Sequence, residues 1–458
     1  MLCRTPRRNP GAAQEPDAGQ SPAGKYSPAT AMSVVVANMI GTGVFTSLGF
    51  QLLDIQSGFV LIMLWVVGGL TALCGAISYA ELGAALPRSG GEYNFLSQIY
   101  HPAAGYVSGW ISATIGFAAP TALAAITFGT YLASVFPSLS PTWLACLLVL
   151  ALTSVHAGNR RGSGGVQQVF TVLKVLLILG FCMISWLLVA EPQDVEFLPA
   201  PGDATLLTSG AFAVALIYVN YAYTGWNAAT YLTSELERPQ HALSRVLVLG
   251  TGVVMVLYVL LNATFLHVAP MAEMAGRLEI GYVSAQFVFG PAGGDIMGVV
   301  LALLLVSTVS AMVLAGPRVL QVIGQDFRAF RLLARTNRHG LPVTAILFQS
   351  ALALLFIATA SFETILVFAG FTLGLNTFFA VLGVFVLRWR RPDLPRPYRA
   401  ALYPLTPLIF LAFTGWTLTY ILLQRPHEAL MGLAIVASGA LFYGLTVLLS
   451  GRSRSDPR

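Results

Sequence analysis

The chain has 458 residues, of which 56% are hydrophobic and only 10% are charged. A soluble protein has about a quarter of its residues charged, so this composition excludes soluble domains and indicates an integral membrane protein. The formal charge of +6 comes from arginines between apolar segments, which argues against a nucleic-acid-binding surface. The four cysteines, Cys3, Cys74, Cys146 and Cys182, form no CxxC pair, which indicates free thiols rather than disulfides or a zinc site.

Residues 1–28 contain no apolar stretch, which predicts a disordered cytoplasmic N-terminal tail rather than a signal peptide. Twelve apolar segments follow, and each is long enough to cross the membrane as a helix. They lie at about 31–51, 58–86, 103–136, 141–157, 166–190, 208–232, 245–268, 294–317, 342–360, 364–387, 403–423 and 429–450. Residues 451–458 are predicted to form a cytoplasmic tail. The sequence therefore predicts an all-α polytopic membrane protein with 12 transmembrane helices.

The basic residues indicate how these helices are oriented. Of the 25 Lys and Arg residues, all except Arg277, Arg425 and Lys174 lie on the same side as the N-terminus. Cytoplasmic segments of membrane proteins are enriched in such residues. The pattern therefore predicts a multi-pass protein of the plasma (inner) membrane with both termini cytoplasmic. The positive charge would border anionic membrane lipid, and no nucleic-acid partner is expected.

The spacing of the segments divides the chain into two similar halves. The second to fifth segments begin a nearly constant number of residues before the seventh to tenth. We interpret 29–190 as a first five-helix repeat, 206–388 as a second, and 401–450 as two additional transmembrane helices. Because five is odd, the second repeat is inverted in the membrane, and inverted repeats are typical of secondary transporters.

Glycines interrupt the first segment of each repeat at a similar depth. The first contains IGTGVF, in which Gly41 and Gly43 flank Thr42, and the sixth contains NYAYTGWNAA with Gly225. Glycine weakens a helix, and the freed N–H and C=O groups need partners inside the membrane. A zwitterion bound between the repeats would supply both kinds of partner. The alternative is that these glycines only let helices pack closely.

The sequence resembles the amino acid–polyamine–organocation (APC) superfamily in strings that follow the family order beyond residue 30. They are IGTGVF at 40–45, GGLTALCGAISYAELGAALPRSGGEYNFL at 68–96, QQVFTVLK at 167–174, GWNAATYLTSELERPQ at 225–240, LAGPRVL at 314–320 and LRWRRPDLPRPYRAALYPLTP at 387–407. The resemblance implies the leucine-transporter-type fold, a 5+5 inverted repeat plus two C-terminal helices. It also implies that the protein is an amino acid permease that works by alternating access.

The resemblance further implies where the substrate binds. Its carboxylate would meet the N–H groups of Thr42 and Gly43 and the Thr42 hydroxyl, at the positive end of a half-helix. Its ammonium would meet the carbonyls of Met39, Tyr221 and Thr224. Tyr221 and Trp226 are candidate gates, although such aromatic residues also occur as ordinary packing. The candidate substrate-binding residues are Met39, Gly41, Thr42, Gly43, Tyr221, Thr224, Gly225, Trp226 and Asn227.

Lys174 lies inside the fifth segment, where a charged side chain is costly unless it is paired. One interpretation is a lysine whose amine reaches the membrane surface. The other is a fixed cation, which by the resemblance would replace the ion that joins the first and eighth helices of sodium-coupled relatives. Because burial disfavours a charged amine, Lys174 could also carry a transported proton. Ser307 and Ser310, one turn apart in the eighth segment, are its candidate oxygen partners in this coupling role.

No acidic residue lies deep in the predicted spans one, three, six, eight or ten. A cationic side chain would need a buried carboxylate, so a neutral L-amino acid is favoured, with Asn227 and Asn376 as polar contacts. Protons or a counter-exchanged amino acid are the expected co-substrates. The alternatives are a cationic amino acid or polyamine exchanger of the same fold and a non-transporting sensor. Neither HExxH nor GxSxG occurs, so no enzyme activity, cofactor or metal site is expected.

Three expectations concern residues at the edges of the spans. Residues 270–293 are long enough for a short re-entrant or lid helix. Charges at helical spacing predict an amphipathic helix over 317–341 at the inner surface. Glu81, near the inner end of the second segment, is expected to pair with a loop arginine.

Overall fold

The computed structural model describes residues 27–158, 163–236, 239–327, 330–338 and 340–452. Helices joined by turns and loops account for these ranges, which confirms the all-α class. The predicted tails at 1–28 and 451–458 fall almost wholly outside the described residues. Of these two segments, only the N-terminal end of the first helix, its cap and the last residues of the final helix are described.

Among its described residues, the first half of the chain forms eight α-helices and one π-helical turn. They are α1 (Pro28–Met39), α2 (Gly43–Gln51), α3 (Gly58–Ala85), α4 (Glu92–Ile99), α5 (Pro102–Ile111), the π-helical turn η1 (Ser112–Gly116), α6 (Ala118–Val135), α7 (Pro141–Gly158) and α8 (Ser163–Leu188). Ser57, which precedes α3, accepts a hydrogen bond from the backbone N–H of Val60 and so begins that helix.

The part of the second half that the structure describes contains nine α-helices and one 3₁₀ segment. They are α9 (Asp203–Leu207), α10 (Gly210–Tyr223), the 3₁₀ segment η2 (Ala228–Glu235), α11 (Pro239–Val268), α12 (Met271–Met274), α13 (Ile280–Asp326), α14 (Val343–Thr359), α15 (Phe362–Arg390), α16 (Leu405–Gln424) and α17 (Pro426–Arg452). Ser209 and Ser361 cap α10 and α15 in the same way as Ser57 caps α3.

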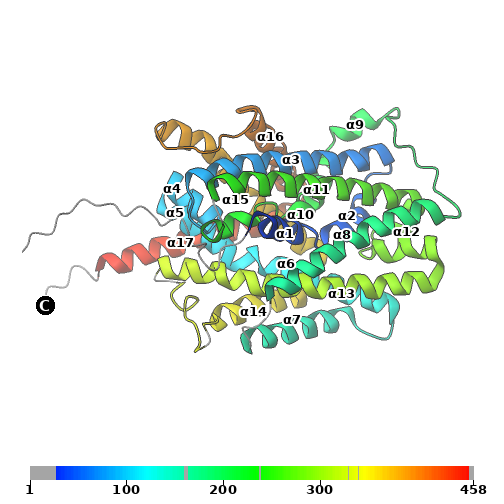
Figure 1. Ribbon diagram of the computed structural model, residues 1–458, viewed down its shortest axis with the longest axis horizontal. Helices are drawn as coiled ribbons and strands as arrows, with labels where there is room; N and C mark the ends of the chain where they lie inside the picture. Colours follow the sequence, from blue (N-terminus) through cyan, green and yellow to red (C-terminus); the bar gives the residue numbers. More distant parts are fainter. Residues whose placement is uncertain (1–26, 159–162, 237–238, 328–329, 339, 453–458) are drawn as a thin grey trace, which may run out of the picture.

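Ten helical stretches of the described residues are long and apolar enough to cross a membrane, so the protein is a multi-pass membrane protein. The sixth and ninth predicted spans correspond to the shorter apolar helices α10 and α14. The count of 12 spans therefore stays a prediction. Figure 1 shows most long helices running side by side, with α4 and α5 at one end and α9 and α12 at the other.

The short helix expected within 270–293 corresponds to the first part of α13, residues 280–289, which ends at a kink at Gly290 (φ 73°) before Pro291; its role as a lid or re-entrant helix stays a prediction. The expected amphipathic helix at 317–341 is wrong, because α13 runs on from this kink to Asp326. Pro317 lies inside α13 without ending it, because a proline in a membrane helix is tolerated where neighbouring groups satisfy the freed carbonyl. The charged residues after Pro317 therefore continue the membrane helix as far as Asp326, and turns follow.

The termini of three long helices meet at the end of the molecule that carries α4. Arg88, after α3, binds Asp326 at the end of α13, and Arg388 of α15 binds Glu81 of α3. We call this the arginine-rich end. Glu81 pairs with arginine, but its bidentate partner Arg388 belongs to α15, whereas the expected loop arginine is represented by Arg396 at 3.6 Å.

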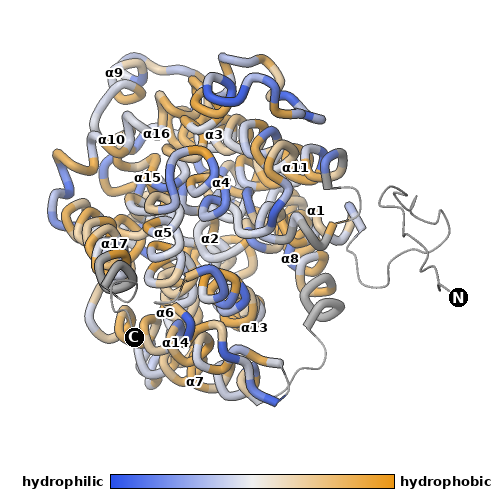
Figure 2. The backbone as a smooth tube through the Cα atoms, turned by 90° about the vertical axis from the view of Figure 1, so that its left-hand side faces the viewer, coloured by the Kyte–Doolittle hydropathy of each residue, from blue (hydrophilic) through white to orange (hydrophobic). Residues whose placement is uncertain are grey.

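The two interrupted helices lie in the middle of the bundle. α2 packs on α10, and α1 packs on η2, so the four pieces contact one another pairwise. The helices around them carry large exposed apolar side chains, such as Trp143 and Leu147 of α7 and Leu441 of α17. Figure 2 shows these peripheral helices as largely hydrophobic. This distribution suits a protein surrounded by lipid.

Candidate functional site

A cavity of about 1,130 Å³ lies beside the two helix breaks. Its wall is formed by both interrupted helices together with α6, α13 and α15. Ser33, Ser89, Gln325 and Gly340 also line it, so the cavity extends to the arginine-rich end. Eleven of the candidate residues line it: Met39, Gly41, Thr42, Gly43, Tyr221, Thr224, Gly225, Trp226, Asn227, Ser307 and Ser310. Asn376 lines it as well.

The break between α1 and α2 leaves unpaired backbone donors at the cavity. Ile40, Gly41 and Thr42 lie outside both helices, and α2 begins at Gly43. Within the described residues no hydrogen bond uses the N–H of Thr42 or Gly43. The first N–H groups of a helix carry partial positive charge, so this end of α2 attracts a carboxylate.

Close packing explains two of the three glycines. A Cβ on Gly43 would lie 2.4 Å from the Ala222 Cα, and a Cβ on Gly225 would lie 2.8 Å from the Asn38 carbonyl carbon. Gly225 also has a backbone φ of 106°, which residues other than glycine rarely adopt. Gly41 is different, because its nearest neighbour would be the Thr308 Cγ2 at 3.7 Å. Gly43 and Gly225 therefore allow close packing, and they also lie where the two helices are interrupted.

Tyr258 of α11 bridges the two breaks. Its hydroxyl donates to the Met39 carbonyl and lies 3.1 Å from the Ala222 carbonyl. The Met39 carbonyl also accepts from the Gly41 N–H at 2.7 Å, so protein donors use both of its lone pairs. Among the described residues, no hydrogen bond reaches the Thr224 carbonyl. Nothing in the sequence singles out Tyr258 among the other polar residues of its span, such as Thr251 and Asn262.

The two aromatic candidates belong to the cavity wall. Trp226 packs edge-on against Tyr79, with ring centroids 4.7 Å apart, and against Phe410 at 6.1 Å. Trp226 and Tyr221 are each 7% exposed. Both side chains are therefore wedged between neighbours while one face remains at the cavity.

Lys174 of α8 lies behind the wall and is 3% exposed. Its amine donates to the Ile40 carbonyl at 3.0 Å and to the Thr308 hydroxyl at 2.7 Å. It therefore holds the break in the first span against α13 and does not reach the membrane surface.

The expected pairing of Lys174 with Ser307 and Ser310 is wrong. Ser307 donates to the Leu304 carbonyl of its own helix, as membrane serines commonly do. Ser310 lies 2.8 Å from the Nε2 of His156 on α7. Thr308, the residue between them that faces α8, supplies the oxygen instead.

Glu92 is a buried acidic residue at the cavity that was not predicted from the sequence. It begins α4, outside the spans, and is 2% exposed. Its carboxylate accepts hydrogen bonds from the Tyr79 hydroxyl at 2.9 Å, from the Tyr231 hydroxyl at 2.6 Å, and from the Asn227 amide. The sequence signal was the preceding Gly90–Gly91 pair, whose φ values of 125° and 53° turn the chain inward.

Aromatic residues separate the cavity from the end opposite the arginine-rich end. Phe50 of α2 stacks between Tyr218 of α10, at 5.4 Å, and Phe362 of α15, at 5.8 Å. The Tyr218 hydroxyl and Arg425 both donate to Glu363 at 2.7 Å. None of these five residues lines the cavity.

At the arginine-rich end, the Tyr93 hydroxyl and Arg88 both bind the Asp326 carboxylate. Burial, and then the Asp326 carboxylate, raise the pKa of Tyr93 above its usual range. Arg88 is 55% exposed, so this cluster borders solvent.

Comparison with known proteins gives one matching family and several similar chains. The family model described as amino acid permease matches residues 26–439. The large neutral amino acids transporter small subunit 2 of Mus musculus is 30% identical over 436 residues, covering 91% of this chain and 80% of its own. The b(0,+)-type amino acid transporter 1 of Mus musculus is 26% identical over 426 residues, with coverage of 91% and 87%. The Asc-type amino acid transporter 1 of Mus musculus is 26% identical over 440 residues, with coverage of 94% and 81%.

Proposed function

Because the chain belongs to the amino acid permease family and is an amino acid transporter, we propose that it moves neutral L-amino acids through the cavity by alternating access. The observation that carries this proposal is the pair of interrupted helices. One presents unpaired N–H groups at Thr42 and Gly43, and the other presents the Thr224 carbonyl. A zwitterion satisfies both at once.

In this proposal the substrate carboxylate accepts from the Thr42 and Gly43 N–H groups and from the Thr42 hydroxyl. The ammonium donates to the Thr224 carbonyl, because the Met39 carbonyl is occupied by Gly41 and Tyr258; the Tyr221 carbonyl accepts from the Thr224 N–H and keeps one lone pair for the same ammonium. These interactions are common to all α-amino acids. The side chain is then selected by the rest of the wall.

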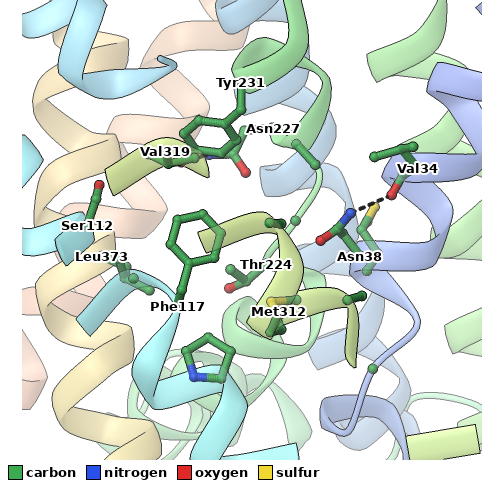
Figure 3. A pocket seen from close by; sticks show the side chains of 18 of the residues that line it. Val34, Asn38, Ser112, Phe117, Thr224, Asn227, Tyr231, Met312, Val319 and Leu373 are labelled. Carbon is green, nitrogen blue, oxygen red and sulfur yellow. Dashed lines mark hydrogen bonds between the residues drawn. The ribbon is translucent and has the colours of Figure 1, made fainter. Parts of the chain in front are cut away.

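A neutral side chain is favoured for two reasons. Near the breaks the wall includes the apolar side chains of Phe117 and Leu373, which Figure 3 labels, and that of Ile217. One similar chain is named a large neutral amino acids transporter, and another an Asc-type amino acid transporter. Glu92 does not demand a cationic ligand, because three neutral donors already bind its carboxylate.

A cationic amino acid or polyamine exchanger is the second candidate. The buried carboxylate of Glu92 at the cavity wall favours it, since the sequence argument for a neutral substrate assumed that no such group was present. Competition by lysine and by a diamine separates the two candidates.

We further propose that transport is an exchange of amino acids. Lys174 supports this, because a fixed amine bound to Ile40 and Thr308 does the bridging that a co-transported cation would do. A lysine held by two protein oxygens needs no ion to enter or leave.

The topology is also part of the proposal. Residues 29–190 and 206–388 would be the two inverted repeats, which is supported by the interruption of the first span of each. Both termini would be cytoplasmic and the protein would reside in the plasma membrane among anionic lipid, with the arginine-rich end inside. The cavity would then open to the cytoplasm, while the layer around Phe50 closes the outer side.

Uptake by purified protein in liposomes tests the function. We expect radiolabelled L-leucine to accumulate only when unlabelled neutral amino acid is present inside, and an imposed pH gradient to have no effect. Lysine and putrescine should compete poorly. Strong competition by either would replace the neutral assignment, and uptake into empty vesicles driven by a pH gradient would refute exchange.

A further inference from the structure

Glu92 is a buried carboxylate at the cavity wall that has no part in the transport cycle described above. Within the described residues no lysine, arginine or histidine forms an ion pair with it. An ionised carboxylate away from water is costly unless hydrogen bonds or a cation compensate it. Glu92 therefore fixes the orientation of the side chains that donate hydrogen bonds to it, and two of these, Asn227 and Tyr231, line the cavity.

Three donors from two elements converge on this carboxylate. Tyr79 of α3 and Asn227 bind Oε1, and Tyr231 of η2 binds Oε2 at 2.6 Å. The second hydrogen of the Asn227 amide points to the Tyr231 oxygen at 3.5 Å. Figure 3 shows Asn227 and Tyr231 together at one wall of the cavity, near Thr224.

This arrangement fixes which way the Asn227 carboxamide points. A carboxylate can only accept hydrogen bonds, so the amide nitrogen must face Glu92. The orientation is thus dictated by chemistry, although oxygen and nitrogen of an amide look alike in shape. With the nitrogen turned to Glu92, the Asn227 oxygen is left as an acceptor on a residue that lines the cavity.

We propose that Glu92 is a positioning residue that holds the Asn227 oxygen toward the cavity, where it accepts a hydrogen bond from the ammonium group of the substrate. The inference rests on the proposed function and adds a second acceptor to the Thr224 carbonyl. The negative charge behind Asn227 strengthens the attraction, because charges interact over several ångströms where water is excluded.

Replacement of Glu92 by glutamine weakens this constraint without changing the size of the side chain. A glutamine oxygen in the Oε1 position accepts from Tyr79 and Asn227, but the nitrogen in the other position can only donate, so the Tyr231 hydroxyl must turn to accept from it. The Asn227 amide is then held by a neutral acceptor, and the charge behind it is lost. Aspartate keeps the charge and the acceptors and should restore the function.

The test compares two ligands that differ only at the amino group. Inhibition of exchange is measured for L-leucine and for the 2-hydroxy acid with the same side chain, in which a hydroxyl replaces the ammonium. In Glu92→Gln the preference for leucine should fall about tenfold, since a hydrogen bond to a charged group is lost. Glu92→Asp should stay close to wild type. Tyr79→Phe is the matched control, because it removes a donor to Glu92 that does not contact Asn227, and its preference should be unchanged.

Equal loss of affinity for both ligands in Glu92→Gln would show a merely structural role and would overturn the proposal. If that variant does not fold, Asn227→Leu decides, because it must lower the same preference; an unchanged preference there also overturns the proposal. A wild-type protein that exchanges no amino acid would refute the proposed function and this inference with it. Exchange with an unaltered preference would refute the inference alone.

Discussion

The amine of Lys174 lies 2.7 Å from the hydroxyl of Thr308, which joins α8 to α13 deep inside the bundle. The same amine holds the Ile40 carbonyl at 3.0 Å, directly before the break that exposes the Thr42 N–H. The geometry of the proposed site for the substrate carboxylate therefore depends on the contact between α8, in the first half of the sequence, and α13, in the second half. This dependence can be measured.

Replacement of Thr308 by valine removes one oxygen from the buried amine while keeping the shape of the side chain. Hydrogen bonds to charged groups contribute about 1.5–3 kcal/mol, so we expect exchange of L-leucine to fall about tenfold or more. Thr308→Ser should retain activity. Ser307→Ala is the matched control, because Ser307 bonds only its own helix. A similar loss in Ser307→Ala and Thr308→Val would contradict the assignment.

Replacement of Thr42 by valine tests the carboxylate subsite. The hydroxyl of Thr42 is expected to donate to the substrate carboxylate, so its loss should raise KM about tenfold with little change in the maximal rate. Thr42→Ser keeps the donor and should stay near wild type. Concentration-dependent exchange in liposomes gives both parameters. An unaltered KM in Thr42→Val would show that the carboxylate binds elsewhere.

The glycines at the first break should differ in their tolerance of a methyl group. Gly43→Ala places a Cβ 2.4 Å from the Ala222 Cα and should destabilise the protein by about 1–3 kcal/mol. Gly41→Ala meets nothing closer than 3.7 Å and should leave the thermal midpoint unchanged. Unfolding in detergent provides the measurement. Equal midpoints for the two variants would argue against the close packing.

The interactions of Glu81 with Arg388 and Ala400 should contribute more to stability than the ion pair between Arg88 and Asp326. Glu81 is 1% exposed and accepts from Arg388 at 2.8 and 2.7 Å and from the Ala400 N–H at 2.7 Å. Glu81→Gln leaves arginine charge uncompensated and should cost about 3–5 kcal/mol.

Arg88→Gln removes a pair whose arginine is 55% exposed, and such pairs contribute about 1 kcal/mol or less. Thermal unfolding of both variants is compared with wild type in the same detergent. A larger loss for Arg88→Gln than for Glu81→Gln would reverse the ranking and contradict this interpretation.

The helices and their breaks could be predicted because they depend on local patterns. Long apolar stretches place the helices, and Gly225 with its φ of 106° marks the second break. The α13 helix was predicted too short, because Pro317 and the charges after it are typical of helix ends. Only the neighbours of a proline in three dimensions decide whether the helix continues.

The sequence predicted candidate residues that lie in local motifs, such as the two helix breaks. It did not predict contacts between segments that are far apart in the sequence. Lys174 was correctly placed inside the membrane, but the choice of Thr308 over its neighbouring serines depends on which face of α13 meets α8. Tyr258 carries no local signal of its role, and the only signal for Glu92 is the Gly90–Gly91 pair before it. Both act through partners far away in the sequence.

Contacts along α2 and α10 begin at the tight approach of Gly43 to Ala222. Ser47 then donates to the Tyr218 carbonyl at 3.2 Å, and Phe50 stacks on the Tyr218 ring. These three successive contacts oppose any sliding of α2 along α10. A tilt of one half-helix should therefore carry the other with it, and the stacking of Phe50 on Phe362 joins this pair to α15.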